Sequence, residues 1–395
     1  MRLLVLHSEL GVLRGGGENF TRNLFSAFVE RGHQVEAAFL ADYRGKYPIP
    51  LPASIKPIPI PGWWSRNAGQ RIFSSLRHYL PCRDKIRAAW DRVQEAVSWR
   101  TIDWHDRRFQ RRIERDFVHM WGGFDVVYVH ASPLLASRVA QHRPTILRLP
   151  GPTAVDMGPM LRAVHAVCAN GDALVRIRRF LGNHAIELPI GIDRDRFTPE
   201  GSSIRSQLGW KEHDRIVGYV GRLTHLKGVD LLATAFQEVS HTMPSAKLLI
   251  IGSGSEEQFI RSILAKEIAC GSAHIEFDVN HEQLPNWYRA MDLFVMPSRY
   301  ENFSNAMLEA MACGVPFLGS DVGGNRILSE TGGGGLFEPA SVASLSSRMR
   351  QLLQNLTELR SRGRQGAAYV RSCCSWNASA ERLEEIIVSR LGVKT

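Results

Sequence analysis

Residues 1–40 decide the fold class; they read MRLLVLHSELGVLRGGGENFTRNLFSAFVERGHQVEAAFL. The apolar run Arg2–Leu6 predicts a β-strand, and a loop that ends in three glycines follows it. From Phe20 to Phe28 the apolar residues recur at helical spacing, and the apolar run Val35–Leu40 predicts a second strand. A strand–helix–strand sequence this compact is typical of a parallel sheet. The chain therefore begins as an α/β protein.

A second α/β series follows a turn-rich connector near residue 190, where the composition shifts. Apolar runs of strand length, each followed by a helical pattern, occur at residues 215–220, 246–251 and 293–297. We therefore expect two α/β domains, residues 1–190 and 191–375. A last helix, within residues 376–395, is expected to pack back on the first domain. Within that domain, residues 41–62 are rich in proline and are expected to be irregular.

The overall composition points to an anionic partner. A chain of 395 residues is long enough for two domains. A composition of 44% hydrophobic and 22% charged residues is typical of a soluble globular protein with a sizeable core. The formal net charge is +10. A basic balance of this kind favours nucleic acid, an anionic membrane surface or a phosphate-bearing substrate. No nucleic-acid-binding motif appears, so we expect no nucleic-acid partner.

Cysteine usage and hydropathy indicate the compartment. The six cysteines form no CxxC pair, so a zinc site or a disulfide framework is not expected, and a reducing compartment is favoured. The apolar N-terminus reads as the first strand, not as a signal peptide, because it breaks at His7 and lacks a small-residue cleavage site. No apolar run reaches the length of about 18 residues that a membrane span needs. We expect a cytoplasmic protein.

The richest stretch for chemistry is RYENFSNAMLEA, residues 299–310, which follows a predicted strand and opens a helix near Ser304. Glu301 then lies in the loop, and Glu309 lies inside the helix on the same face as Asn305. Free N–H groups at a helix start can hold phosphate, and a carboxylate deeper in the helix could bind two vicinal ribose hydroxyls. The alternative is an amphipathic helix whose second glutamate is a solvated charge.

A second stretch is VGRLTHLKG, residues 220–228, at the carboxyl end of a predicted strand, where open α/β sheets bind ligands. Its two cations, Arg222 and Lys227, could clamp a pyrophosphate through charge-assisted hydrogen bonds of roughly 1.5–3 kcal/mol each. The alternative is an ordinary loop with two solvated cations.

Glycine-rich turns follow three predicted strands. Gly15-Gly16-Gly17 and Gly252-Ser253-Gly254 would let the backbone approach a ligand closely, although a tight turn is the alternative for both. Neither is a full GxGxxG fingerprint, so neither specifies a dinucleotide. We expect Ser320–Gly324 to be a turn that lines the same cleft.

Taken together and in this order, these pieces resemble the family 4 retaining glycosyltransferases of GT-B fold. The matching stretches are the first strand with GGGEN and its helix, LPIGIDRDRFTP, VGRLTHLKGVD, LLIIGSGSEE, MDLFVMPSRYENFSNAMLEAMACGVP and SDVGGN. The resemblance covers nearly the whole chain except residues 41–120. It implies two Rossmann-like domains whose parallel sheets face one another across a cleft. It also implies retaining transfer of a hexose-type sugar from a UDP- or GDP-sugar to an acceptor hydroxyl.

The resemblance also implies residue roles. Arg222 and Lys227 would neutralise the donor pyrophosphate, Glu301 would lie near the donor sugar, and Glu309 would bind the ribose. The further donor contacts that it implies are Gly16 and Gly17 in the first domain, and Val279, Phe303, Ser304 and Asn305 in the second.

The first domain departs from the family pattern. Many members carry a histidine after the strand that corresponds to Thr145–Leu149, whereas this chain reads Arg148-Leu149-Pro150-Gly151 there. His130, after the preceding strand, matches a different family position and is a candidate catalytic residue alongside Glu301, Arg222 and Lys227. A structural histidine at the strand end is the alternative for His130.

We expect neither a metal site nor a cofactor. Cleavage of the donor places negative charge on the leaving phosphate, and fixed cations with a helix N-terminus can stabilise that charge without a metal. Removal of one such group typically costs about 10²–10³ in rate. Asp193-Arg194-Asp195 spells a DxD motif, but it matches the connector of the family.

Residues 63–120 combine five tryptophans with many arginines. Tryptophan prefers the lipid headgroup level and arginine attracts anionic lipid, at about 1 kcal/mol for each basic residue near the surface. This segment therefore predicts peripheral docking on the inner face of the membrane, which a lipid-linked acceptor would require. The alternative is a set of helices with tryptophans in the core and solvated arginines.

Two other functions remain open. A sugar-nucleotide epimerase or a phosphorylase of the same fold would convert the donor without an acceptor, or would require free phosphate. A non-catalytic protein that binds sugar nucleotides would not turn the donor over at all.

Overall fold

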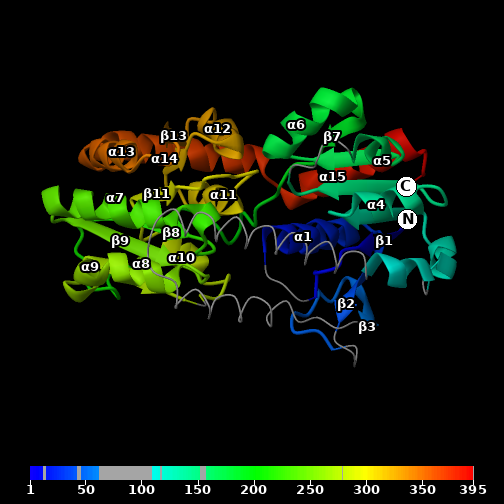
Figure 1. The fold of residues 1–395 in the computed structure, drawn as a ribbon, viewed down its shortest axis with the longest axis horizontal. Helices are drawn as coiled ribbons and strands as arrows, with labels where there is room; N and C mark the ends of the chain where they lie inside the picture. The colour runs from blue at the N-terminus through cyan, green and yellow to red at the C-terminus, as the bar shows by residue number, and fades with distance from the viewer. Residues whose placement is uncertain are drawn as a thin grey trace, which may run out of the picture. The chain divides into compact units, whose positions relative to one another are not determined.

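The computed structural model describes residues 1–11, 15–41, 46–61, 109–115, 118–151, 157–277 and 279–394. The chain divides into two compact units: unit 1 comprises Met1–Gly191 with Trp376–Thr395, and unit 2 comprises Ile192–Ser375. Both units are α/β, with helices packed on a parallel sheet (Figure 1). The predicted fold class, two parallel-sheet α/β domains, is confirmed.

The sheet of unit 1 has seven strands in the order β3-β2-β1-β4-β5-β6-β7, and each neighbouring pair is parallel. The strands are β1 Arg2–Leu6, β2 Gln34–Ala41, β3 Lys56–Pro61, β4 Val126–His130, β5 Thr145–Leu149, β6 Ala166–Ala169 and β7 Ala185–Glu187. The chain runs outward from β1 to β3 and then returns to place β4 on the other side of β1. This reversal creates a switch point between β1 and β4, which is where open parallel sheets bind ligands.

The helices of unit 1 cover both faces of this sheet. They are α1 Gly16–Glu30, α4 Pro133–Val139, α5 Gly158–Arg162, α6 Gly171–Leu181 and α15 Trp376–Ile386, with the 3-10 helices η1 Val118–Gly123 and η3 Gly182–His184 and the π-helix η5 Ile387–Leu391. Residues 109–115 are also helical. One face carries a single apolar cluster to which alternate strand residues such as Leu4 and Leu6 contribute. On the other face, Tyr128 packs edge-on against Phe25 of α1.

The interpretation of residues 41–62 as irregular is wrong for β3, which forms an edge strand beside β2. Its prolines stand at alternate positions, with Pro57 opposite Ala37 and Pro59 opposite Phe39. Alternate residues of a strand direct their N–H groups to the same side. An edge strand therefore tolerates prolines whose missing donors face away from the sheet, and the intervening residues can bond to β2.

The last helix packs on the first helix of the chain. Trp376 at the start of α15 meets Phe20 of α1 edge-on, with 5.5 Å between ring centroids. At the other end, Glu384 accepts hydrogen bonds from Arg31 Nε at 2.7 Å and from His33 Nε2 at 2.6 Å. Figure 1 shows α15 in red among the blue and green elements of unit 1. The C-terminal helix therefore completes unit 1.

Unit 2 repeats the plan with a six-stranded parallel sheet in the order β10-β9-β8-β11-β12-β13. Its strands are β8 Arg215–Val220, β9 Ala246–Ile251, β10 Ala273–Glu276, β11 Leu293–Met296, β12 Phe317–Ser320 and β13 Gly334–Phe337. Its helices are α7 Val229–Thr242, α8 Glu257–Ile263, α9 Ala265–Ala269, α10 Leu284–Tyr288, α11 Asn305–Ala312, α12 Gly323–Ser329, α13 Val342–Gln354 and α14 Leu356–Cys373, with the short turn η4 His225–Lys227. The switch point of this sheet lies between β8 and β11.

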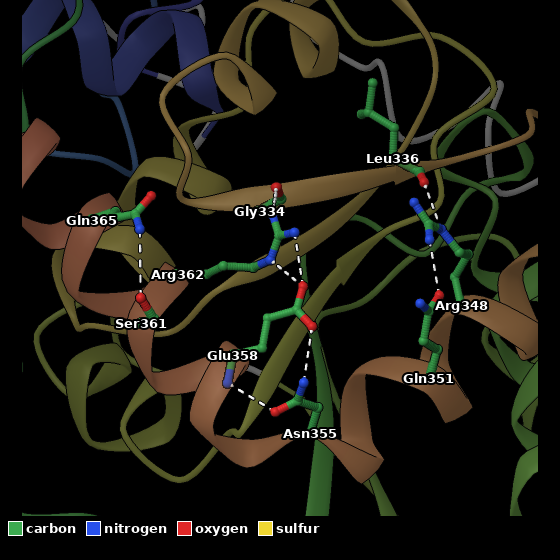
Figure 2. A network of polar contacts seen from close by, with 9 residues as sticks. All are labelled: Gly334, Leu336, Arg348, Gln351, Asn355, Glu358, Ser361, Arg362 and Gln365. Carbon is green, nitrogen blue, oxygen red and sulfur yellow. Dashed lines mark hydrogen bonds and ion pairs between the residues drawn. The ribbon is translucent and has the colours of Figure 1, made fainter.

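Arginines from α13 and α14 cover the edge strand β13 (Figure 2). Arg362 donates to the Gly334 carbonyl at 2.6 Å and to Glu358 at 2.8 Å. Arg348 reaches the Leu336 carbonyl at 3.4 Å. Asn355 caps α14 by accepting from the Glu358 N–H. The two carbonyls lie on the outer edge of the sheet, so these contacts satisfy acceptors that an edge strand would otherwise expose.

None of the helices in the described ranges is both long and apolar enough to cross a membrane.

Candidate functional site

In unit 2, the candidates Arg222, Lys227 and Glu301 lie on loops at the carboxyl edge of the sheet, and Asn305 and Glu309 lie in α11. Residues 221–228, here called the cation loop, follow β8, and residues 297–304, here called the acidic loop, follow β11. Because β8 and β11 are parallel neighbours on either side of the switch point, both loops emerge at the same edge. The sequence prediction of Arg222, Lys227 and Glu301 at strand ends agrees with this placement.

The two loops pack backbone against backbone. Gly228 has a φ of 66°, and a Cβ there would lie 2.0 Å from the Pro297 carbonyl oxygen. Only glycine fits such an approach in the left-handed region. Arg299 then joins the loops, because its guanidinium binds both Asp230 oxygens at 2.8 Å and the His225 carbonyl at 2.6 Å. Arg299 is therefore a structural cation, and the sequence did not reveal its partner.

Lys227 and Glu301 are in direct contact. The Lys227 Nζ lies 2.6 Å from Glu301 Oε2, and their side chains are 19% and 8% exposed. Ser298 Oγ donates to the same oxygen at 3.4 Å. The two residues were expected at the pyrophosphate and the sugar respectively, and the structure brings them together as one ion pair.

Arg222 is the exposed cation of the cation loop. Its carbonyl accepts from the buried Tyr219 hydroxyl at 2.8 Å, which anchors the backbone. Within the part of the chain that the structure describes, its guanidinium has no hydrogen bond or ion pair. Its donors are therefore available to an anion that enters from solvent.

The N-terminus of α11 faces the same edge. Ser304 is the N-cap, and its side chain accepts from the Met307 N–H at 3.2 Å. Helix geometry leaves the N–H groups of the first turn without intrahelical partners, so those of Asn305 and Ala306 remain as donors. With the positive end of the helix dipole, they make this helix start a candidate anion-binding position.

A second layer of contacts holds the acidic loop. Gly324 donates its N–H to the Glu301 carbonyl at 3.0 Å, and a Cβ on Gly324 would lie 2.0 Å from the Asn302 carbonyl oxygen. Ser320 Oγ donates to the Ser298 carbonyl at 2.5 Å. The stretch from Ser320 to Gly324 was expected to be a turn alone, but its last two residues begin α12. Its role in holding the acidic loop was not apparent from the sequence.

Glu309 is held by two donors that sequence reasoning missed. His281 Nε2 donates to Oε1 at 3.1 Å, and the Tyr288 hydroxyl donates to Oε2 at 2.8 Å. The hydrogen bond to Glu309 raises the pKa of His281 above its usual value, against the opposing effect of burial. Burial and then Glu309 raise the pKa of Tyr288 far above its usual value. Val279, expected at the base, lies half-buried two residues before His281.

In unit 1 the candidate residues again lie beside the switch point. The three glycines were expected in a loop, but α1 already begins at Gly16, so Gly16 and Gly17 form its first turn. A Cβ on Gly17 would lie 3.0 Å from His130 Nε2, which places this turn against the last residue of β4. The structure therefore brings Gly17 and His130 together.

His130 is a buried, neutral histidine. Its ring stacks on His7 with 3.9 Å between centroids, and Thr21 Oγ1 lies 3.0 Å from His7 Nδ1. Burial, then the charges of His7 and Arg148, lower the pKa of His130 well below its usual 6.5. His130 can therefore give or accept a hydrogen bond but does not supply a positive charge near neutral pH.

Arg148 does not take the place of the histidine that the family pattern has in this region, because its side chain packs beneath α1. Its guanidinium carbon lies 3.6 Å from the centroid of the Phe20 ring, and Nη2 donates to Asn170 at 3.3 Å. Burial lowers its pKa. The residue therefore belongs to the layer between sheet and helix.

The remaining expectations concern the connector and the basic segment. Asp193 of the DxD sequence pairs with Arg196 at 3.3 Å and accepts from the Arg196 N–H, as in a local turn. The described ranges hold no group of three His, Cys, Asp or Glu side chains that could bind a metal. Most of the tryptophan-rich segment 63–120 lies outside the described residues.

Comparison with known proteins shows what the chain is similar to. Residues 202–368 match the family model for glycosyl transferases group 1. Over 231 residues the chain is 32% identical to the GDP-mannose-dependent monoacylated alpha-(1-6)-phosphatidylinositol monomannoside mannosyltransferase of Corynebacterium glutamicum, a match that covers 55% of this chain and 60% of that protein. The chain therefore covers less than two thirds of the length of this curated relative.

Solved structures resemble the chain along its whole length. Sucrose-phosphate synthase from Thermosynechococcus elongatus superposes with a TM-score of 0.77 at 19% identity and covers 100% of both chains. Anabaena HepE, solved with UDP and glucose, gives a TM-score of 0.68 at 17% identity and covers 98% of this chain and 100% of its own. At such identities the likeness shows the fold alone. Residues 202–368 thus resemble the group 1 glycosyl transferases, and the two Rossmann-like units have the GT-B fold.

Proposed function

We propose that this protein transfers a hexose-type sugar from a UDP- or GDP-sugar to an acceptor hydroxyl, with retention of configuration and without a metal ion or cofactor. One observation carries the proposal: the exposed Arg222, the Lys227–Glu301 pair and the start of α11 lie on adjoining loops at one sheet edge. All of them fall within the stretch that matches the family model.

These groups suit a departing diphosphate. Negative charge grows on the leaving phosphate as the glycosidic bond breaks, and donors already in place stabilise that charge without reorganisation. Arg222 has free donors, Lys227 is fixed by its partner, and the first turn of α11 adds N–H groups. In unit 1, Gly16 and Gly17 allow a close backbone approach to the phosphates.

Retention follows most simply from attack on the face that the leaving group vacates, with the departing phosphate helping to deprotonate the acceptor. Glu301 then orients the donor sugar and is not itself the nucleophile. Lys227 and Ser298 both bind its Oε2. Oε1, which has no hydrogen bond to the described residues, can accept from a sugar hydroxyl. His130 would contribute a neutral hydrogen bond from unit 1.

The names of the relatives suggest the class of the donor and of the acceptor. The C. glutamicum relative is named for GDP-mannose and a phosphatidylinositol mannoside, and HepE was solved with UDP and glucose. We therefore propose a glycolipid, polysaccharide or other glycoconjugate acceptor, carried on a lipid at the cytoplasmic face of the membrane. Retention of the protein by anionic liposomes at low salt, and its release at high salt, would support this docking; equal recovery with neutral liposomes would contradict it.

Thermal-shift screening with UDP, GDP, ADP and their sugars tests the donor. A nucleotide that binds the folded state raises the melting temperature by mass action, so a hit names the base. A transfer assay with that donor in the presence of a chelator then tests metal independence. Donor conversion without an acceptor would indicate an epimerase, and dependence on free phosphate would indicate a phosphorylase.

A further inference from the structure

The carboxylate of Glu309 receives one hydrogen bond on each oxygen. Tyr288 binds Oε2 at 2.8 Å and His281 binds Oε1 at 3.1 Å, and both donors come from the segment between β10 and β11. A carboxylate oxygen can accept two hydrogen bonds. One acceptor position therefore remains on each oxygen of Glu309.

Tyr288 is a fixed donor. Its side chain is 0% exposed, and its ring packs against Phe197 and Phe294 at centroid distances of 6.1 and 5.9 Å. A buried tyrosine ring in such a pocket cannot turn its hydroxyl elsewhere. The hydroxyl therefore sets the position of Oε2.

His281 is the solvent-exposed donor of the two. Its side chain is 41% exposed, and its ring lies 5.4 Å from that of Phe197. The charged groups that face it are Glu309, Asp193 and Arg196. Because Tyr288 is buried and His281 reaches solvent, a ligand approaches the Glu309 carboxylate from the His281 side.

Two fixed oxygens, each with one free acceptor position, match a pair of vicinal hydroxyls. Without its donors, the carboxylate would rotate about its last side-chain bond, whose torsion is broad and two-fold. From this geometry we propose that His281 and Tyr288 are positioning residues, which orient Glu309 toward the donor ribose and give the site its preference for ribonucleotides over 2′-deoxyribonucleotides. The inference rests on the proposed function, since it assumes a nucleotide diphosphate donor.

Calorimetric titration of UDP and GDP, each with its 2′-deoxy form, tests this proposal. The wild type binds the ribonucleotide roughly tenfold or more tightly, as expected for a hydrogen bond to a charged group. Tyr288→Phe and His281→Gln each weaken ribonucleotide binding several-fold and change 2′-deoxy binding much less, so the preference shrinks. In Glu309→Gln, adding Tyr288→Phe changes the preference no further.

His274→Gln is the matched control, because it breaks another histidine–glutamate pair of unit 2, His274 with Glu276 at 3.2 Å. This variant keeps the wild-type preference. An equal loss of ribo and 2′-deoxy binding in both test variants would show a merely structural role and overturn the inference. An unchanged preference in either His281→Gln or folded Tyr288→Phe would do the same. A wild type that binds none of the nucleotides would instead overturn the proposed function itself.

Discussion

Among single residues, Lys227 has two separable effects, on transfer and on stability. Lys227→Ala removes a phosphate partner and leaves the Glu301 carboxylate, 8% exposed, without its cation. We expect transfer to fall by about 10²–10³, and the melting temperature to fall as well. Adding Glu301→Gln removes the uncompensated charge, so the double variant should regain stability but not activity. A double variant as unstable as Lys227→Ala would contradict the pairing argument.

Arg222→Ala, unlike Lys227→Ala, should lower transfer without lowering stability. The guanidinium is exposed and makes no hydrogen bond or ion pair with the described residues, so its removal should change the free energy of unfolding by less than about 0.5 kcal/mol. Transfer should still fall, and the nucleotide diphosphate should bind more weakly, because the free cation is lost. Denaturant unfolding and calorimetric titration measure the two quantities. A large stability loss with unchanged binding would refute this role for Arg222.

The sequence predicted as site residues those whose type and spacing carry a chemical signal, namely Arg222, Lys227, Glu301 and Glu309. It did not locate their supports. His281 and Tyr288 lie 28 and 21 residues from Glu309 and belong to no motif, so their contact depends on how α10 packs beside α11. The Lys227–Glu301 contact, across 74 residues, was hidden for the same reason.

At the scale of elements, the junction between α12 and the acidic loop should control the site. Gly324→Ala would place a Cβ 2.0 Å from the Asn302 carbonyl, so the loop that carries Glu301 must move. We expect both a lower melting temperature and weaker transfer. Gly335→Ala is the control, because a Cβ there meets no atom within 4 Å. Equal behaviour of the two variants in thermal melting and transfer assays would contradict the role of this junction.

Elements were predictable where one signal dominated. β1, β5, β8 and β9 have the bounds that their apolar runs indicate, because buried parallel strands are continuous apolar runs. β3 was missed because proline-rich segments are typical of loops, and a strand accepts prolines at these positions only at the edge of a sheet. β13 was missed because two of its four residues are glycines, and contacts with α13 and α14 hold it in place.

At the scale of the whole molecule, unit 1 depends on both ends of the chain, since α15 supplies Glu384 to Arg31 and His33 of the N-terminal part. The Arg31 hydrogen bond, then that of His33, lowers the pKa of Glu384 below its usual 4.5 against the effect of burial. A carboxylate with a depressed folded-state pKa stabilises the fold above its unfolded pKa. This stabilisation is lost as pH falls through the lower folded value.

Glu384→Gln should therefore destabilise unit 1 at neutral pH and flatten the loss of stability below pH 4.5. Glu385→Gln serves as the control, because the Glu385–Arg382 pair is a largely exposed contact within one helix and should contribute less than about 1 kcal/mol. Denaturant unfolding as a function of pH measures both variants. If Glu384→Gln retained the wild-type slope in acid, the tie between the two ends of the chain would not be electrostatic, and the apolar contact of Trp376 with Phe20 would have to hold α15 in place.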